Sequence, residues 1–393
     1  MLNPLRSLVS LASLASLGSV GSLVAATRLE PLRRLGDSCK PVLRDSVAGL
    51  LSRVGATRPA RFARGALTVV TFHRVLPKDK LRSYPLPGLA VTPEQLEQVL
   101  GRLSVHFSCM PLIEAYRLWQ EGRTAERPPL AVTFDDGALD NHEHALPVLK
   151  RLGVRASFYI PVSNVDEQRA PWHDRLGFAL LRSVGAIRKR RDVDFDPLLE
   201  PFGLRAQAFA AVLPDEAVAI AGAGVARAKA LSLEQRTLSM ERLEAVLGGD
   251  QVPDWAGLMS WDQIRELGRA GHEIGSHSLT HPILPDCSAD QLRAEIASSR
   301  ARLAAATGAE VASFCYPNGS YDARCLDEVL NAGYACAVTT RPGLNRLGTP
   351  RFELRRCDMD YARLGTRRGE FSEPRLFLRL SGLGPGMSVA SPY

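Results

Sequence analysis

The sequence predicts an α/β fold in which βα units surround a parallel sheet or a barrel. From about Leu67 onward, short apolar runs alternate with helix-like segments, as in a chain of βα units. Carboxylates and imidazoles directly follow two of these runs, at the end of a strand where barrels gather their catalytic groups. The 393 residues, of which 45% are hydrophobic, suffice for a sizeable core.

The strands are expected at six apolar runs bounded by polar or turn-forming residues. These strand candidates are Leu67–Phe72, Leu130–Phe134, Ala156–Ile160, Glu273–Ser276, Ser313–Tyr316 and Ala335–Thr339.

Three helix starts carry a capping box, in which a Ser or Thr and a Gln three residues later satisfy each other's free backbone donors. The pairs are Thr92 with Gln95, Ser260 with Gln263, and Ser288 with Gln291. Glycines stand where helices should stop, at Gly271, Gly308 and Gly333.

Residues from about 163 to 258 interrupt the alternation. An Arg-rich run at 188–191 precedes Ala-rich, helix-like sequence from 205 to 247. Because the segment stands between two barrel units, it is expected to be an insertion that forms a lid or a substrate-side cap.

The two ends of the chain differ from the middle. Residues 1–65 are basic, low in complexity and then helical, and they could contact a membrane surface or form a solvated tail. A signal peptide over residues 1–26 is the alternative. No basic–aromatic motif points to nucleic acid. Residues 346–393 form an Arg-rich tail without recognisable chemistry.

Seven cysteines, an odd number without CxxC spacing, indicate free thiols and a reducing compartment. A cytoplasmic or membrane-associated protein is therefore expected in preference to a secreted or periplasmic one.

Two adjacent carboxylates, Asp135 and Asp136, follow the strand candidate Leu130–Phe134, and Gly137 comes next. Taken alone, Asp-Asp-Gly is equally typical of a turn. A second element changes this balance: His277 and His281 follow the strand candidate Glu273–Ser276, four residues apart.

Two imidazoles at this spacing can converge on one metal ion. Pro282 disfavours a helical conformation at His281, and no Glu lies between the histidines, so the HExxH protease motif is excluded. One carboxylate and two imidazoles leave a coordination position open, which is typical of a catalytic site. The second carboxylate would then be free to act as general base.

Thr-Phe-Asp-Asp-Gly at 133–137, followed by Ser-His-Ser-Leu-Thr-His at 276–281, resembles the polysaccharide deacetylase family, also called the NodB homology domain or carbohydrate esterase family 4. The resemblance covers roughly residues 66–345. It implies a distorted (β/α) barrel, one divalent metal ion, and hydrolysis of N-acetyl groups on amino sugars. It assigns the general base to Asp135 and the metal ligands to Asp136, His277 and His281.

Two departures from the family pattern concern the groups around the base. Cys315 stands where the family's third motif has the Arg that orients the base, and no His follows His281 to act as general acid. His73, at the end of the strand candidate Leu67–Phe72, is the substitute acid, as in family members with a permuted motif order. The alternative is an ordinary strand-end histidine.

Further residues are expected to contact substrate. Tyr316 and Asn141 lie near strand ends, and a backbone N–H after the Tyr316–Pro317 turn could stabilise an oxyanion. Trp172 could stack on a sugar ring, with polar contacts from His173 and Asp174, or it could anchor the insertion as a buried side chain.

The expected function is metal-dependent deacetylation of amino sugars in a bacterial surface or extracellular polysaccharide or in its lipid-linked oligosaccharide precursor. Zinc is expected first, although manganese, cobalt and nickel suit the same ligands. A hydrolase of small amides on the same barrel and a catalytically silent carbohydrate-binding protein are the alternatives.

Overall fold

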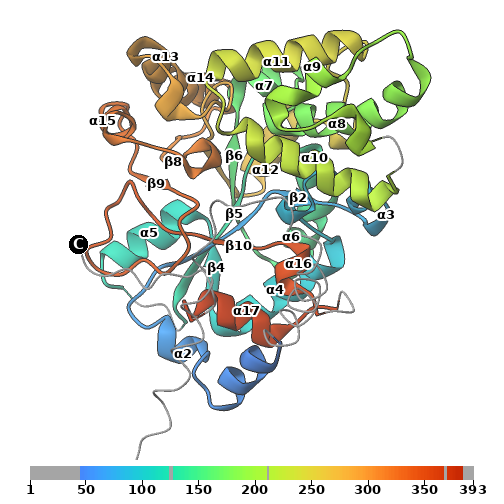
Figure 1. Ribbon diagram of the computed structural model, residues 1–393. Helices are drawn as coiled ribbons and strands as arrows, with labels where there is room; N and C mark the ends of the chain where they lie inside the picture. The colour runs from blue at the N-terminus through green and yellow to red at the C-terminus, as the bar shows by residue number, and fades with distance from the viewer. Residues whose placement is uncertain (1–44, 124–126, 210–211, 367–369, 384–393) are drawn as a thin grey trace, which may run out of the picture. The chain divides into compact units, whose positions relative to one another are not determined.

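The computed structural model describes residues 45–123, 127–209, 212–366 and 370–383 (Figure 1). Residues Val47–Tyr393 form one compact unit, to which the following description applies. The basic segment and the signal-peptide alternative fall largely outside the described residues. None of the described helices combines the length and the apolar character needed to cross a membrane.

An eight-stranded parallel sheet forms the centre of the unit, in the order β10-β1-β5-β6-β7-β8-β9, with β4 also paired to β5. Its strands are β1 (Thr68–Phe72), β4 (Ser108–Met110), β5 (Pro129–Phe134), β6 (Ser157–Ile160), β7 (Glu273–Ser276), β8 (Ser313–Cys315), β9 (Cys336–Val338) and β10 (Cys357–Asp358). A separate pair joins β2 (Arg74–Val75) to β3 (Ala90–Val91). All six predicted strands are confirmed, whereas the short strands β2, β3, β4 and β10 were not predicted.

Residues 351–358 connect the two edges of the sheet. The Ala337 N–H donates to the Arg351 carbonyl (2.9 Å), and the Thr339 N–H donates to the Leu354 carbonyl (2.8 Å), so this segment lies beside β9. A few residues later Cys357 pairs with Val70 of β1. The sheet therefore curls, and the fold is the predicted distorted (β/α) barrel.

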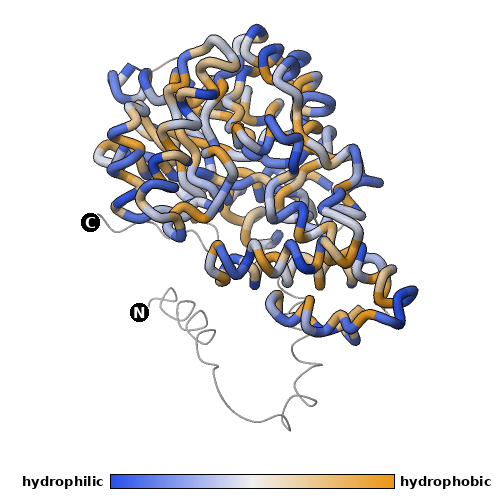
Figure 2. Tube along the Cα trace, turned by 90° about the horizontal axis from the view of Figure 1, so that it is seen from above, coloured by the Kyte–Doolittle hydropathy of each residue, from blue (hydrophilic) through white to orange (hydrophobic). Residues whose placement is uncertain are grey.

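Helices surround the sheet, and hydrophobic and hydrophilic residues alternate along them (Figures 1 and 2). They are α2 (Pro59–Phe62), α3 (Lys78–Leu81), α4 (Pro93–His106), α5 (Leu112–Gln120), α6 (Leu146–Leu152), α7 (Val162–Glu167), α8 (Trp172–Lys189), α9 (Asp196–Leu199), α10 (Pro214–Ala228), α11 (Leu233–Val246), α12 (Trp261–Arg269), α13 (Ala289–Arg293), α14 (Ser299–Thr307), α15 (Ala323–Asn331), α16 (Tyr361–Leu364) and α17 (Glu373–Leu380).

The predicted capping boxes form at the starts of α4, α12 and α13. The glycines expected at helix ends all have positive φ: 84° at Gly271, 68° at Gly308 and 79° at Gly333. Because glycine adopts this left-handed conformation without a steric penalty, these positions end the helices as predicted.

Aromatic side chains pack in the barrel core near the carboxyl ends of β1, β5 and β6. The rings of Phe72, Phe134 and Phe158 stack across β1, β5 and β6, with centroids 5.3 Å and 4.9 Å apart. All three side chains are fully buried. Because Phe134 immediately precedes Asp135, this stack fixes the position of the end of β5, from which Asp135 and Asp136 follow.

Helices α8 to α11 pack around a hydrophobic cluster of their own, which includes Leu180, Phe202 and Leu243. A buried ion-pair network joins this helical insertion to the barrel. Arg74 binds Asp140 (Nε–Oδ2, 2.6 Å) and, across to α8, Asp174 (Nη1–Oδ2, 2.8 Å). The insertion is therefore held against the barrel by fixed contacts as well as by its chain connections.

Candidate active site

Asp135 and Asp136 leave β5 in different directions. The Asp135 N–H still donates to the Phe72 carbonyl (3.0 Å), which extends the ladder between β1 and β5 by one residue. Asp136 has a positive φ of 71°, and Gly137 follows with φ 64°. A left-handed conformation costs a residue other than glycine about 1 kcal/mol, and aspartate tolerates it better than most. This turn separates the two carboxylates at the carboxyl end of the strand.

The loop after β7 presents the two histidines. Ser278 and His281 both have positive φ (67° and 58°), so the loop is not helical, as Pro282 predicted. The His281 N–H donates to Ser278 Oγ (3.0 Å). The buried carboxylate of Glu295 accepts hydrogen bonds from the backbone N–H groups of Leu279 and Thr280 (2.8 and 2.9 Å). These bonds hold the loop in a fixed shape.

Asp136, His277 and His281 converge as the sequence predicts. Asp136 Oδ1 lies 3.3 Å from His277 Nε2 and 3.2 Å from His281 Nε2, and all three side chains are buried. His277 Nδ1 must donate its hydrogen to the Cys315 carbonyl (2.8 Å), which leaves the Nε2 lone pair free. Asp136 Oδ1 has no hydrogen-bond partner among the described residues. This donor set fits one divalent cation.

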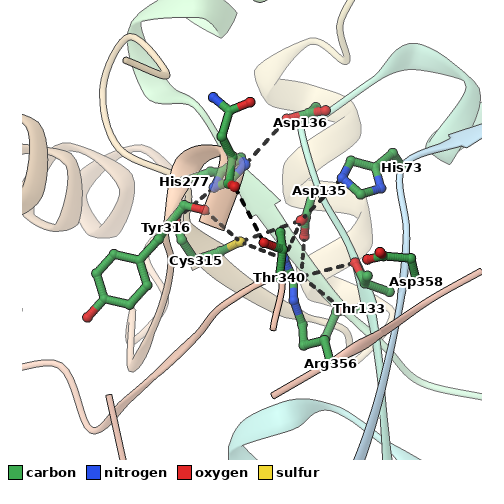
Figure 3. A network of polar contacts seen from close by, with 12 residues as sticks. His73, Thr133, Asp135, Asp136, His277, Cys315, Tyr316, Thr340, Arg356 and Asp358 are labelled. Carbon is green, nitrogen blue, oxygen red and sulfur yellow. Dashed lines mark hydrogen bonds and ion pairs between the residues drawn. The ribbon is translucent and has the colours of Figure 1, made fainter. Parts of the chain in front are cut away.

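Asp135 binds a residue from the other end of the chain (Figure 3). Arg356, next to β10, donates from Nη1 to Asp135 Oδ1 (2.8 Å) and from Nη2 to Oδ2 (2.7 Å). Both side chains are buried. Burial by itself would raise the pKa of Asp135, but the charge and hydrogen bonds of Arg356 outweigh it and hold this pKa below its usual value.

Arg356 supplies the arginine that the third motif lacks. Cys315 Sγ lies 3.2 Å from Arg356 Nη2 and 3.5 Å from Asp135 Oδ2. The small thiol therefore leaves room for the guanidinium of Arg356, which directly precedes β10. The sequence analysis recognised no such contact in the Arg-rich tail at residues 346–393.

His73 reaches the same carboxylate from β1. Its Nε2 lies 3.6 Å from Asp135 Oδ2, and its side chain is 16% exposed (Figure 3). The carbonyl of His73 accepts a hydrogen bond from Asn141 Nδ2 (2.8 Å), which fixes the end of the strand. The structure thus brings His73 beside the candidate base, as the substitute-acid hypothesis requires.

A cavity of about 780 Å³ opens above these groups. Asp135, Asp136, His73, His277 and His281 line its floor. One wall is aliphatic and comes from α10 and from the loop before β3, through Val218, Ala219, Val225, Leu86 and Leu89. The insertion therefore forms part of the wall of the cavity, and its role as a substrate-side cap stays a prediction.

The family model described as polysaccharide deacetylase matches residues 122–337, more than half of the chain. The chain belongs to the polysaccharide deacetylase family. It is a hydrolase of non-peptide amide bonds. Enzymes of this family depend on a metal ion and act on N-acetylated polysaccharides. His73 and Arg356 both lie outside the matched residues.

Several solved structures are similar to the chain at low sequence identity. The Streptococcus pyogenes deacetylase PplD has 15% identity and a TM-score of 0.49, over 75% of this chain and 92% of that one. IcaB from Ammonifex degensii has 18% identity and a TM-score of 0.46, over 74% and 90%. The BpsB deacetylase domain from Bordetella bronchiseptica has 17% identity and a TM-score of 0.46, over 75% and 96%. No curated protein matches the chain.

Two residues that were expected to contact substrate lie outside the cavity of the deacetylase. Asn141 is fully buried, and its amide holds the His73 carbonyl instead. Trp172 packs against the core of the insertion, and the guanidinium of Arg236 stacks on its ring at 4.7 Å. Trp172 is partly buried in this position, and its contact with a sugar ring stays a prediction.

The turn after β8 does contribute to the cavity. Tyr316 is buried and lines it, and its own N–H donates to the Val338 carbonyl (3.2 Å). Pro317 has no N–H, so the first amide after the turn that could face substrate belongs to Asn318. Asn318 also lines the cavity, and its Nδ2 is buried without a hydrogen-bond partner among the described residues.

For His173 of α8, the sequence analysis suggested a polar sugar contact but not a position beside the candidate metal ligands. Its Nε2 lies 3.5 Å from Asp136 Oδ2, and its ring centroid lies 5.1 Å from that of His281. Burial by itself would raise the pKa of Asp136, but the neighbouring imidazoles of His173, His277 and His281 hold this pKa well below its usual value. The signal that could have identified His173 was a histidine at the start of the insertion, beside the site.

Proposed function

We propose that this protein removes acetyl groups from N-acetylated amino sugars in a bacterial surface or extracellular polysaccharide or in its lipid-linked precursor. The observation that supports this proposal is that two sets of side chains line the same cavity. One set is the candidate metal ligands Asp136, His277 and His281, and the other is the pair of Asp135 with His73.

One divalent ion, with zinc as the proposed ion, would be held by Asp136, His277 and His281. It would supply Lewis-acid activation of water and of the acetyl carbonyl. The chain's own residues then have separate tasks. Asp135, ionised beside Arg356, accepts the proton of the attacking water. Arg356 holds the carboxylate in one orientation during this transfer.

His73 donates a proton to the leaving amine. It is partly exposed in the cavity, so a substrate nitrogen can approach it, and its Nε2 is directed at the same carboxylate that accepts the water proton. Asn318 binds the acetyl oxygen or a sugar hydroxyl through its backbone or side-chain N–H.

The size of the cavity supports a sugar substrate. A volume of about 780 Å³ is typical of a small-molecule site. The aliphatic wall from α10 would exclude water from the acetyl group and pack against the apolar face of a sugar ring or the first part of a lipid chain. Contact of the basic N-terminal residues with a membrane surface stays a prediction.

Acetate release from N-acetylglucosamine oligomers tests the proposal, with wild type compared with Asp135→Asn. We expect wild type to release acetate without shortening the oligomer, and the rate to fall by about 10²–10⁴ in the variant because the general base is lost. Acetate release only from small amides would favour the small-amide hydrolase. A purified protein that binds oligomers but releases no acetate would favour the silent binding protein.

A further inference from the structure

A second cavity, of about 300 Å³, shares His281 with the active-site cavity. It lies between the insertion and the loop after β7, and its walls come from α7, α8, α11 and residues 280–282. His281 lines both cavities, so any ligand of the second one would touch a candidate metal ligand. We call this space the Arg236 cavity, after the buried arginine of α11 in its wall.

Four buried nitrogen atoms of residues that line the Arg236 cavity have no hydrogen-bond partner among the described residues. They are Trp172 Nε1, Arg175 Nε, Arg236 Nη2 and His281 Nδ1, and Arg175 Nε lies 3.5 Å from Asp250 Oδ2 in an ion pair. One buried acceptor in the lining, Asn164 Oδ1, also has no partner among the described residues. Buried donors without partners are rare because their desolvation is costly. Trp172, Arg236 and His281 contribute donors without partners to the walls of one cavity, which favours a ligand there that accepts hydrogen bonds.

The position of Arg236 is fixed by other contacts. Its side chain is 2% exposed, its guanidinium stacks on the Trp172 ring at 4.7 Å, and Nη1 donates to the Leu231 carbonyl (3.1 Å). The carboxylate of Asp286 is 3.8 Å from Nη2, beyond hydrogen-bond distance. The Nη2 of the guanidinium therefore has N–H groups that can donate to a ligand, beside a long ion pair with Asp286.

His281 also has a buried nitrogen, Nδ1, without a hydrogen-bond partner among the described residues. Its Nε2 lies beside Asp136, so Nδ1, which points in a diverging direction on the ring, carries the hydrogen when Nε2 binds a metal. Histidines that bind metals almost always donate this second N–H to a carboxylate, a carbonyl or water. His277 has the Cys315 carbonyl for this purpose, whereas His281 has no such acceptor among the described residues.

We propose that the Arg236 cavity binds a carboxylate, which accepts hydrogen bonds from Arg236, from the Trp172 indole and from His281 Nδ1. These three groups are donors and one is a cation, so they favour an acceptor with negative charge as the ligand. Glu167 and Glu241 also line the cavity and are exposed, which disfavours a ligand with several negative charges.

Two sources offer a single carboxylate: the acetate product and an acidic sugar of the glycan, and both rest on the proposed function. A bound carboxylate would orient His281 and would thereby strengthen metal binding. By linkage, metal and carboxylate then increase each other's affinity.

Trp172 provides a direct readout, since the ligand would contact its indole. We would titrate the full-length, zinc-loaded protein with sodium acetate and, separately, with sodium glucuronate, and follow tryptophan fluorescence at constant ionic strength. The variants are Arg236→Met, which keeps the stacking but removes the donors, and Trp172→Phe. Arg242→Met is the matched control, because Arg242 is an exposed arginine on the same helix.

Wild type and Arg242→Met should show the same saturable change, and Trp172→Phe should show none. The midpoint should rise at least about tenfold in Arg236→Met, the effect of losing a charge-assisted hydrogen bond. Zinc loss to a chelator should slow in the presence of the carboxylate in wild type but not in Arg236→Met. A tighter midpoint for glucuronate would assign the cavity to an acidic sugar, and equal midpoints would assign it to the carboxylate group alone.

An unchanged midpoint in Arg236→Met, with unfolding temperature preserved, would overturn the proposal, as would the absence of any saturable change in wild type. Neither measurement uses turnover, so failure here is distinct from failure to release acetate.

Discussion

Arg356 and Asp135 form a bidentate ion pair inside the barrel, although 221 positions separate them in the chain (2.8 and 2.7 Å). The two planar groups face each other, so the carboxylate has one orientation and stays ionised in a buried place (Figure 3). In this protein the pair takes the place of an arginine that would otherwise stand at Cys315.

Replacement of Arg356 should impair turnover more than substrate binding. We expect Arg356→Met to lower kcat by about a hundredfold or more, because Asp135 loses its orientation. Arg356→Lys should lie in between, since lysine keeps the charge but not the bidentate geometry. Steady-state kinetics of acetate release measures both, and Arg355→Met, at the half-buried neighbouring position, is the control.

The pH profile separates this role from a purely structural one. Without Arg356, burial raises the pKa of Asp135. Because Asp135 acts in its ionised form, activity in Arg356→Met should be lost at a higher pH than in wild type as the pH falls. Loss of activity at the same pH in both proteins would contradict the assignment of Asp135 as the base oriented by Arg356.

His73→Ala should remove turnover but keep the metal. General acid catalysis contributes about 10²–10⁴ in rate, so acetate release should fall within that range. The ligand set Asp136, His277 and His281 is untouched, so metal content should not change. His144→Ala is the matched control, because His144 does not line the cavity. Full activity in His73→Ala would refute the role.

Acid should weaken the fold through His272. The ring is buried against Phe158, its Nδ1 accepts the Ala156 N–H (3.1 Å), and burial lowers its pKa from 6.5 to about 4. In the unfolded chain the imidazole binds a proton below pH 6.5, but in the folded protein only below about pH 4. Stability should therefore decrease as the pH falls from 6.5 to 4, by on the order of 2 kcal/mol.

Denaturant unfolding at pH 7, 5.5 and 4.5 measures this effect. His272→Asn keeps an acceptor for the Ala156 N–H but does not titrate in this range. The variant should show a smaller loss of stability than wild type between pH 6.5 and 4. Equal losses in both proteins would show that His272 does not contribute to acid sensitivity.

The sequence predicts the strands and the metal ligands because their signals are local. Each predicted strand is a buried apolar run, and Asp136, His277 and His281 each lie within a few residues of a strand end. Arg356 was missed for the opposite reason. The adjacent strand β10 has only two residues, and Asp135 is brought near Arg356 only by closure of the barrel.

The structure of the insertion could also be predicted only in part from the sequence. Its Ala-rich composition predicts helices, but the inward face of α8 depends on how that helix packs against the barrel. His173 therefore reaches Asp136, whereas the neighbouring Trp172 faces the insertion core. Tertiary contacts decide between two adjacent residues that look equally suitable in the sequence.

Metal content tests the central claim most directly. Wild type, His277→Ala and His144→Ala would be incubated with zinc, freed of unbound ion and analysed for elemental zinc. The proposed site predicts one equivalent of zinc in wild type and in His144→Ala, and its loss in His277→Ala. Equal zinc in all three proteins, or none in wild type, would contradict a metal site at Asp136, His277 and His281.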